Sequence, residues 1–206
     1  MNNLALIYSD LGKHKEAAEL QLVVLEKRRN LLGKDHPSTL ASLNNLALTY
    51  NDLGKFKEAA ELQLVVLEKR RTLWGEDHAA TLTSMNNLAL TYRALGQSGE
   101  AAELHIVVLE KRRNYLGEDH RSTLKSMHNL ASTYSHLGQS GEAAELHIVV
   151  HERNLLNEDH MHRSTFKRRH SLASTYSDLA KPKEAAELQI LMLVNGVIQA
   201  SLLGMC

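Results

Sequence analysis

The sequence predicts an all-α fold, an elongated solenoid of about five antiparallel helix hairpins. One observation is the seven-residue segment NNLALTY, which occupies residues 44–50 and again 86–92. Related segments begin at residues 2, 128 and 170, so all five copies are spaced 42 residues apart. A second observation is that apolar residues recur every three or four positions, and no segment has the two-residue alternation of a strand. A fixed period of this length is typical of stacked repeats.

The first helix of each repeat is clearest in the second copy. Leu40, Leu43, Leu46 and Tyr50 follow one another at intervals of three and four, which places them on one face of a helix. Gly54 comes next, at a place where a helix C-terminus favours a left-handed residue. We therefore expect the first helix to end there.

The second helix carries its own apolar stripe. Leu62, Val66 and Leu73 lie on it, Glu58 comes early, and Gly75 follows the last turn. Three basic residues precede that glycine, where the helix dipole favours positive charge. The unit is therefore a helical hairpin, and its uncovered face requires a neighbouring copy.

Small residues in the middle of both helices predict close helix packing. The expected contact alanines are Ala5, Ala47, Ala89, Ala131 and Ala173 in the first helices and Ala17, Ala59, Ala101, Ala143 and Ala185 in the second helices.

We expect one continuous array over residues 1–206. Its repeats fall at approximately 1–36, 37–78, 79–120, 121–162 and 163–206. The first and last are incomplete or atypical, which suggests a fragment of a longer array or an atypical gene product. Around His160 the fourth-to-fifth junction loses two residues and gains two, so a shifted or loosened loop is expected there.

The composition is that of a folded protein, with 43% hydrophobic and 23% charged residues. Lysine plus arginine number 24 and aspartate plus glutamate also number 24, so no global field favours nucleic acid. The only cysteine, Cys206, excludes an internal disulfide framework and favours a reducing, cytoplasmic setting.

The segment from Leu188 to Cys206 carries no charge and approaches the length of a membrane span. Polar residues interrupt it, and its start aligns with the second helix of earlier repeats. We therefore expect an uncapped, apolar helix that promotes self-association rather than a membrane anchor.

Leu46, Ala47, Tyr50 and Ala59 have the spacing of a known signature, and the unit resembles the tetratricopeptide repeat. The 42-residue length and the segment LGKDHPSTLASLNNLALTY narrow the resemblance to the kinesin-light-chain type, also found in fungal intracellular receptor-like (NACHT/NB-ARC) proteins. It covers residues 1 to about 190. The resemblance implies a right-handed superhelical solenoid whose first helices line a concave groove, and protein or peptide binding without catalysis or a cofactor.

Polar residues in the first helices are the candidate site. Asparagine is a mediocre helix former, so its recurrence at fixed places invites a functional explanation. In the resembling family, asparagines at matching places hydrogen-bond an extended peptide, although duplication alone could also have preserved them. The candidate peptide-binding residues are Asn3, Asn44, Asn45, Asn86, Asn87, His128 and Asn129.

Three other patterns are candidates for metal binding, catalysis or phosphate binding. His147 and His151 are four residues apart beside Glu152, with His160 and His162 nearby, a spacing that can hold zinc if a third ligand converges. His147 nevertheless occupies the repeat position of Gln21, Gln63 and His105, which favours an ordinary helix face and no metal.

The recurring Asp-His pairs and basic triplets also have structural interpretations. The pairs at residues 35–36, 77–78 and 119–120 stand at helix entrances and favour capping over acid–base chemistry. The triplets at 27–29, 69–71 and 111–113 could bind phosphates, yet each sits where a helix end favours cations. No GxSxG, phosphate-loop or HExxH motif occurs, so an enzyme is not expected.

The sequence therefore predicts a scaffold or adaptor that binds a protein or extended peptide, and no nucleic acid, through the groove of first helices. The alternative is a structural or sensor segment of a larger signalling protein, with no ligand of its own.

Overall fold

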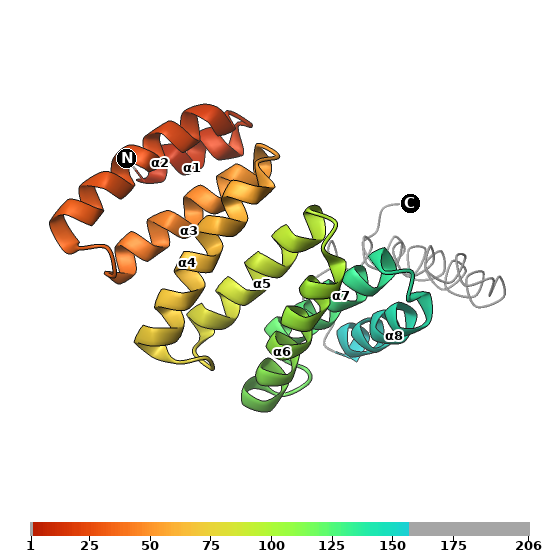
Figure 1. Ribbon diagram of the computed structural model, residues 1–206. Coiled ribbons are helices and arrows are strands. Elements are labelled where there is room, and N and C mark those ends of the chain that lie inside the picture. The colour runs from red at the N-terminus through yellow and green to blue at the C-terminus, as the bar shows by residue number, and fades with distance from the viewer. Residues whose placement is uncertain (1, 157–206) are drawn as a thin grey trace, which may run out of the picture. The chain divides into compact units, whose positions relative to one another are not determined.

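The computed structural model describes residues 2–156, and these form eight α-helices without a strand (Figure 1). The helices are α1 (Asn2–Asp10), α2 (His14–Leu32), α3 (Pro37–Asp52), α4 (Phe56–Trp74), α5 (Ala79–Ala94), α6 (Ser98–Leu116), α7 (Arg121–His136) and α8 (Ser140–Leu156). The predicted all-α architecture of helix hairpins is confirmed. The expected fifth hairpin, the altered loop around His160 and the apolar tail lie outside the described residues.

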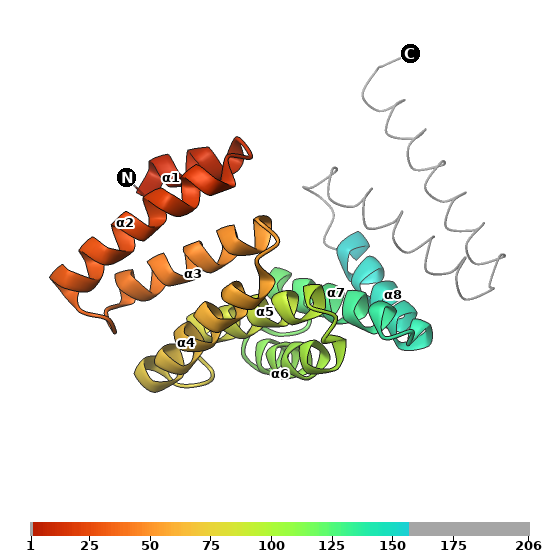
Figure 2. The ribbon, with the colours of Figure 1, turned by 45° about the horizontal axis from the view of Figure 1, so that its top comes forward.

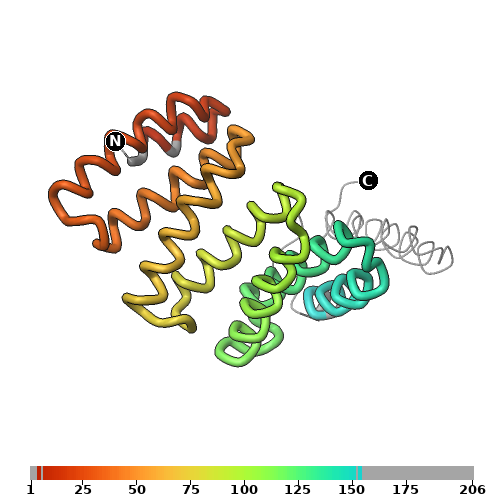
Figure 3. Tube along the Cα trace, in the orientation of Figure 1, coloured from red at the N-terminus to blue at the C-terminus, as the bar shows by residue number. Residues whose placement is uncertain are grey.

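The chain divides within α6 into two compact units, Met1–Lys111 and Arg112–Cys206. In the first unit each of the helices α1 to α5 packs against its neighbour in sequence, and α3 also contacts α5. Figure 3 shows the chain reversing direction from one of these helices to the next, and Figure 2 shows α3 between the α1–α2 hairpin and α4. In the second unit, α7 packs against α8.

Left-handed glycines end the helices where the sequence predicts. Gly54 has a φ of +73°, and the following residue, Lys55, donates its backbone N–H to the Tyr50 carbonyl at 2.8 Å. Gly75 has a φ of +84° and caps α4 through the Arg71 carbonyl. An L-residue with a Cβ rarely adopts this conformation, so Gly54 and Gly75 fix the ends of α3 and α4.

The predicted contact alanines are confirmed wherever the structure describes them. Ala47 in α3 and Ala59 in α4 are both fully buried, as are their counterparts in the other described hairpins. Side chains this small let the two helices of a hairpin approach closely. Ala173 and Ala185 lie outside the described residues.

A buried apolar cluster of the first unit joins three helices. Its buried members include Leu67 from α4, Leu82, Met85 and Leu88 from α5, and Val108 from α6. One hairpin therefore completes its core only with residues of the next, which is the physical reason for stacking.

An arginine near the end of each second helix fastens one hairpin to the next first helix. Arg70 of α4 donates from Nη1 to the Ala80 carbonyl at 3.0 Å and to Ser84 Oγ at 2.8 Å. Its side chain is buried, and that burial lowers the pKa of the guanidinium. We call this arrangement the arginine clamp.

The arginine clamp recurs at every described junction. Arg28 reaches the Ser38 carbonyl at 3.0 Å and Ser42 Oγ at 2.8 Å. In the second unit, Arg112 reaches the Ser122 carbonyl at 3.3 Å and Ser126 Oγ at 2.8 Å. The same donor thus satisfies a backbone and a side-chain acceptor in the first two turns of each following helix.

Truncation of Leu88 to alanine tests the core. This side chain is 2% exposed, whereas Leu73 on α4 is 45% exposed. We expect Leu88→Ala to lower the free energy of unfolding by roughly 2–5 kcal/mol, because it removes buried contacts and leaves a cavity. Urea unfolding followed by circular dichroism measures it. Leu73→Ala is the matched control, and equal losses for the two variants would contradict the proposed core.

Replacement of two adjacent arginines tests the clamp. Arg70→Ala leaves the Ala80 carbonyl and Ser84 hydroxyl without their charged donor, so we expect a loss of roughly 1.5–3 kcal/mol in stability. Arg71 is exposed and pairs with Glu76 at 3.6 Å, so Arg71→Ala should cost less than about 1 kcal/mol. A double-mutant cycle of Arg70 and Ser84 measures their coupling, and zero coupling energy would rule the clamp out as a source of stability.

Candidate peptide-binding surface

The candidate amides lie on the first helices of the hairpins. Asn44 and Asn45 are in α3, and Asn86 and Asn87 are in α5. Asn3 lies in α1, but its side chain is outside the described part of the structure. His128 and Asn129 are in α7 of the second unit.

Side-chain hydrogen bonds join consecutive first helices within the first unit. Asn87 Nδ2 donates to Asn44 Oδ1 at 3.2 Å, and Asn51 Nδ2 donates to Thr91 Oγ1 at 2.8 Å. Both bonds connect α3 with α5 over roughly one repeat in sequence. The asparagines therefore have a structural role that sequence reasoning did not identify.

The candidate residues differ in their accessibility. Asn86 is 7% exposed and Asn129 is 9% exposed, so little of either side chain could meet a ligand. Asn44, Asn45 and Asn87 are half-buried. Among the residues that the structure describes, Asn45 alone of these three forms no side-chain hydrogen bond, which leaves its amide open to a partner.

A pair of histidines joins α7 and α8 in the second unit. The rings of His128 and His147 meet edge to face, with their centroids 5.3 Å apart. Burial, and then repulsion from His128, lower the pKa of His147 from its ordinary value of 6.5 to about 4. His147 is therefore neutral at pH 7 and packs as part of the hairpin.

The metal hypothesis rested on His147, His151 and Glu152. Among the side chains that the structure describes, which do not include that of Glu152, no three of the metal-ligating types come together. His160 and His162, the other residues of that hypothesis, lie outside the described residues.

The Asp-His pairs divide into two structural roles. The histidine is the helix cap: His36 Nδ1 accepts the Ser38 backbone N–H at 3.1 Å, and His78 and His120 do the same for the helices they precede. The aspartate instead faces the next hairpin, since Asp35 pairs with Lys69 at 2.9 Å. The predicted capping role is confirmed, and it belongs to the histidine.

The basic triplets are also used internally. The middle residue of each triplet is the arginine of the clamp. The first residue forms an ion pair in two of them: Lys69 pairs with Asp35, and Lys111 pairs with Asp77, each in the preceding loop. The sequence did not reveal these roles, although one signal was available: a serine follows each clamp arginine by 14 residues in all three described junctions.

Over the described residues, no helix combines the length and the apolar content that crossing a bilayer would require.

The comparisons agree with this geometry. Two family models described as tetratricopeptide repeat match the chain, one over residues 1–72 and the other over 81–122 and 123–160. A crystal structure of the "kinesin light chain nearly identical TPR-like repeats" of Podosopora anserina is 35% identical, with a TM-score of 0.82 over 97% of this chain and 93% of that one. No curated protein sequence matches the chain.

Two more distant structures share the fold alone. BtubC (BKLC) from P. vanneervenii is 22% identical, with a TM-score of 0.76 over 92% of this chain and 78% of that one. MamA from Desulfovibrio magneticus RS-1 is 15% identical, with a TM-score of 0.66 over 96% and 93% of the two chains.

The stacked hairpins and these matches define an α-solenoid of the kind that serves as a protein-interaction scaffold. The chain belongs to the tetratricopeptide repeat family and is an array of the kinesin-light-chain type, as its sequence predicts.

The His128–His147 pair predicts a pH-dependent stability. The unfolded chain binds a proton at His147 near pH 6.5, whereas the folded chain binds it only near pH 4. The stabilisation is therefore complete above pH 6.5 and is lost as the pH falls towards 4, by roughly 1–3 kcal/mol. Chemical unfolding between pH 7 and pH 4 measures this loss.

His147→Gln is the matched control, because glutamine occupies the same repeat position at Gln21 and Gln63. The variant should lack this component of the pH dependence. If the variant and the wild type lose stability in parallel over this range, protonation of His147 is not the cause.

Proposed function

We propose that the chain is a scaffold that binds a protein partner as an extended peptide along the surface formed by its first helices, without catalysis of its own. The observation that supports the proposal is the row of half-buried amides on α3 and α5, in which Asn45 keeps an unused donor and acceptor. The single cysteine, Cys206, supports a cytoplasmic setting.

Amide side chains suit an extended peptide because each presents one acceptor and two donors. Such a group can satisfy the backbone of a peptide without demanding a particular side chain. A repeat of 42 residues brings an equivalent position to the corresponding place on each first helix. Affinity would then come from several similar contacts, and the sequence of the peptide would be read by other side chains.

The same amides also favour the alternative of a structural or sensor segment with no ligand of its own. Asn44 and Asn87 are already hydrogen-bonded to each other at 3.2 Å, so their recurrence has an explanation within the fold. The two functions differ in what they predict for Asn45, which has no such bond among the described residues.

Replacement of Asn45 by alanine tests the scaffold proposal. The probe is a peptide selected by the chain from a random-sequence display library, with its affinity measured by calorimetry. We expect Asn45→Ala to weaken binding about fivefold, because one hydrogen bond contributes about 1 kcal/mol, with no change in the thermal midpoint.

The matched control is Lys57→Ala, an exposed position in the first turn of α4. A display library that yields no specific peptide supports the structural alternative. A selected peptide that binds the Asn45 variant as tightly as wild type places its site elsewhere on the array.

A further inference from the structure

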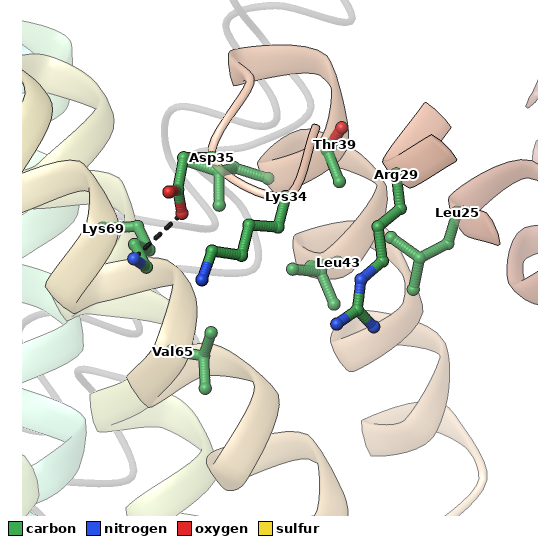
Figure 4. Close-up of a pocket in the computed structure, with 9 residues that line it drawn as sticks. Leu25, Arg29, Lys34, Asp35, Thr39, Leu43, Val65 and Lys69 are labelled. Atoms are coloured by element: carbon green, nitrogen blue, oxygen red, sulfur yellow. Dashed lines mark ion pairs between the residues drawn. The ribbon is translucent and has the colours of Figure 1, made fainter. Parts of the chain in front are cut away.

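A pocket of about 190 Å³ lies between α2 and α4, where the first two hairpins meet. Its apolar surface comes from Leu25, Leu40, Leu43 and Val65 (Figure 4). Charged side chains complete the lining, and Figure 4 shows Lys34 and Lys69 towards one end and Arg29 towards the other. The lining residues come from α2, α3, α4 and the loop between α2 and α3, and none of them is a candidate asparagine.

A difference between the repeats at one position leaves room for this pocket at the first junction. Leu43 occupies the repeat position of Met85 and Met127. Met85 is 0% exposed and Met127 is also buried, whereas Leu43 is only half-buried. The longer methionine is therefore absent from the junction where the pocket lies.

A second difference between the repeats gives the same pocket a net positive charge. At the second junction, Glu76 pairs with Arg71 at 3.6 Å and with Lys111 at 3.8 Å. The third junction has the same arrangement, in which Glu118 pairs with Arg113 at 3.3 Å. Lys111 also pairs with Asp77, and Arg153 pairs with Glu118 and Asp119, so each group contains two cations and two carboxylates and is neutral.

Lys34 occupies the repeat position of Glu76 and Glu118. The first junction therefore contains three cations, Arg29, Lys34 and Lys69, and one carboxylate, Asp35, which pairs with Lys69 at 2.9 Å. In the part of the chain that the structure describes, neither Arg29 nor Lys34 forms an ion pair. The pocket therefore combines a net charge of +2 with the apolar lining described above.

We propose that this pocket binds a carboxylate attached to an apolar group of about the size of a leucine side chain. The volume exceeds the roughly 30 Å³ of a water molecule and is below the roughly 300 Å³ at which drug-sized sites begin, so it suits one such group. The carboxylate pairs with Lys34 at one end of the pocket, where Lys69 also lies, and Arg29 adds positive charge at the other end. The apolar group displaces water from Leu43 and Val65. A free organic acid and the C-terminal residue of a polypeptide both present this chemistry.

The proposal is tested with 4-methylpentanoate as the probe and methyl NMR of Leu25, Leu43 and Val65 as the measurement. We expect saturable shifts in the millimolar range for the acid and none for its neutral amide, 4-methylpentanamide. Inorganic phosphate, an anion without the apolar group, should bind at least about tenfold more weakly. No shift with the acid, or equal shifts with acid and amide, would overturn the proposal.

Two variants copy the neighbouring junctions, so the fold should accept both. Lys34→Glu restores the neutral charge group and should weaken binding at least about tenfold, since it replaces an attraction by a repulsion. Leu43→Met fills the pocket and should abolish the shifts. Unchanged binding by either folded variant contradicts the assignment.

The reverse exchange at the second junction tests whether the residues at these two repeat positions are sufficient to create a binding site. Glu76→Lys combined with Met85→Leu should create a second site, detected as new shifts at Leu67 and Val107. Gly-Gly-Leu, compared with its C-terminal amide, then distinguishes the two sources. Tighter binding of the tripeptide than of 4-methylpentanoate assigns the pocket to a polypeptide terminus, and weaker binding assigns it to a free acid.

Discussion

The hydrogen bonds from Arg70 to Ser84 and the Ala80 carbonyl are the contacts on which the stacking depends. Apolar packing holds the hairpins together but is non-directional, so it does not by itself set the angle between them. A planar guanidinium with two acceptors in the first turns of the next helix provides that direction. His78 caps the same helix, and Thr81 Oγ1 donates to the Gly75 carbonyl at 2.8 Å, so the short loop between the hairpins is fixed at several points.

This polar framework explains why the repeat keeps so many hydrophilic residues in place. Asn44, Asn51 and Lys69 all bond across a junction, and each would look like a surface residue if only one hairpin were considered. Candidate binding residues are therefore those whose side chains form no hydrogen bond or ion pair within this framework. Asn45 on α3, Arg29 on α2 and Lys34 in the loop after α2 are such residues among those described.

The hairpins themselves were predictable from the sequence because their causes are local. The spacing of Leu40, Leu43 and Leu46, the left-handed Gly54 and the buried Ala47 and Ala59 each follow from helix geometry within a single repeat. The arginine clamp and the Asn87–Asn44 bond were not predicted, because they join residues of different hairpins whose relative rotation no single repeat contains. The pocket beside Lys34 was missed for a further reason: Lys34 carries a positive charge where Glu76 carries a negative one, and this reversal matters only once Arg29 and Lys69 are known to be near it.

The distribution of the clamp between two repeats has a consequence for how such an array can change in length. The second and third repeats each carry a donor arginine near the end and an acceptor serine near the start, so copying either 42-residue unit reproduces a complete junction on both sides of the insertion. Arrays can then gain or lose copies without compensating substitutions elsewhere. The sequence also shows where this interchangeability stops: at the fourth-to-fifth junction Asn154 replaces the arginine and Arg168 replaces the serine. Asn154 instead donates to the Val150 carbonyl of its own helix at 2.5 Å. The sequence of this junction therefore lacks both clamp residues, and a gene-level duplication is tolerated most easily for the second and third repeats.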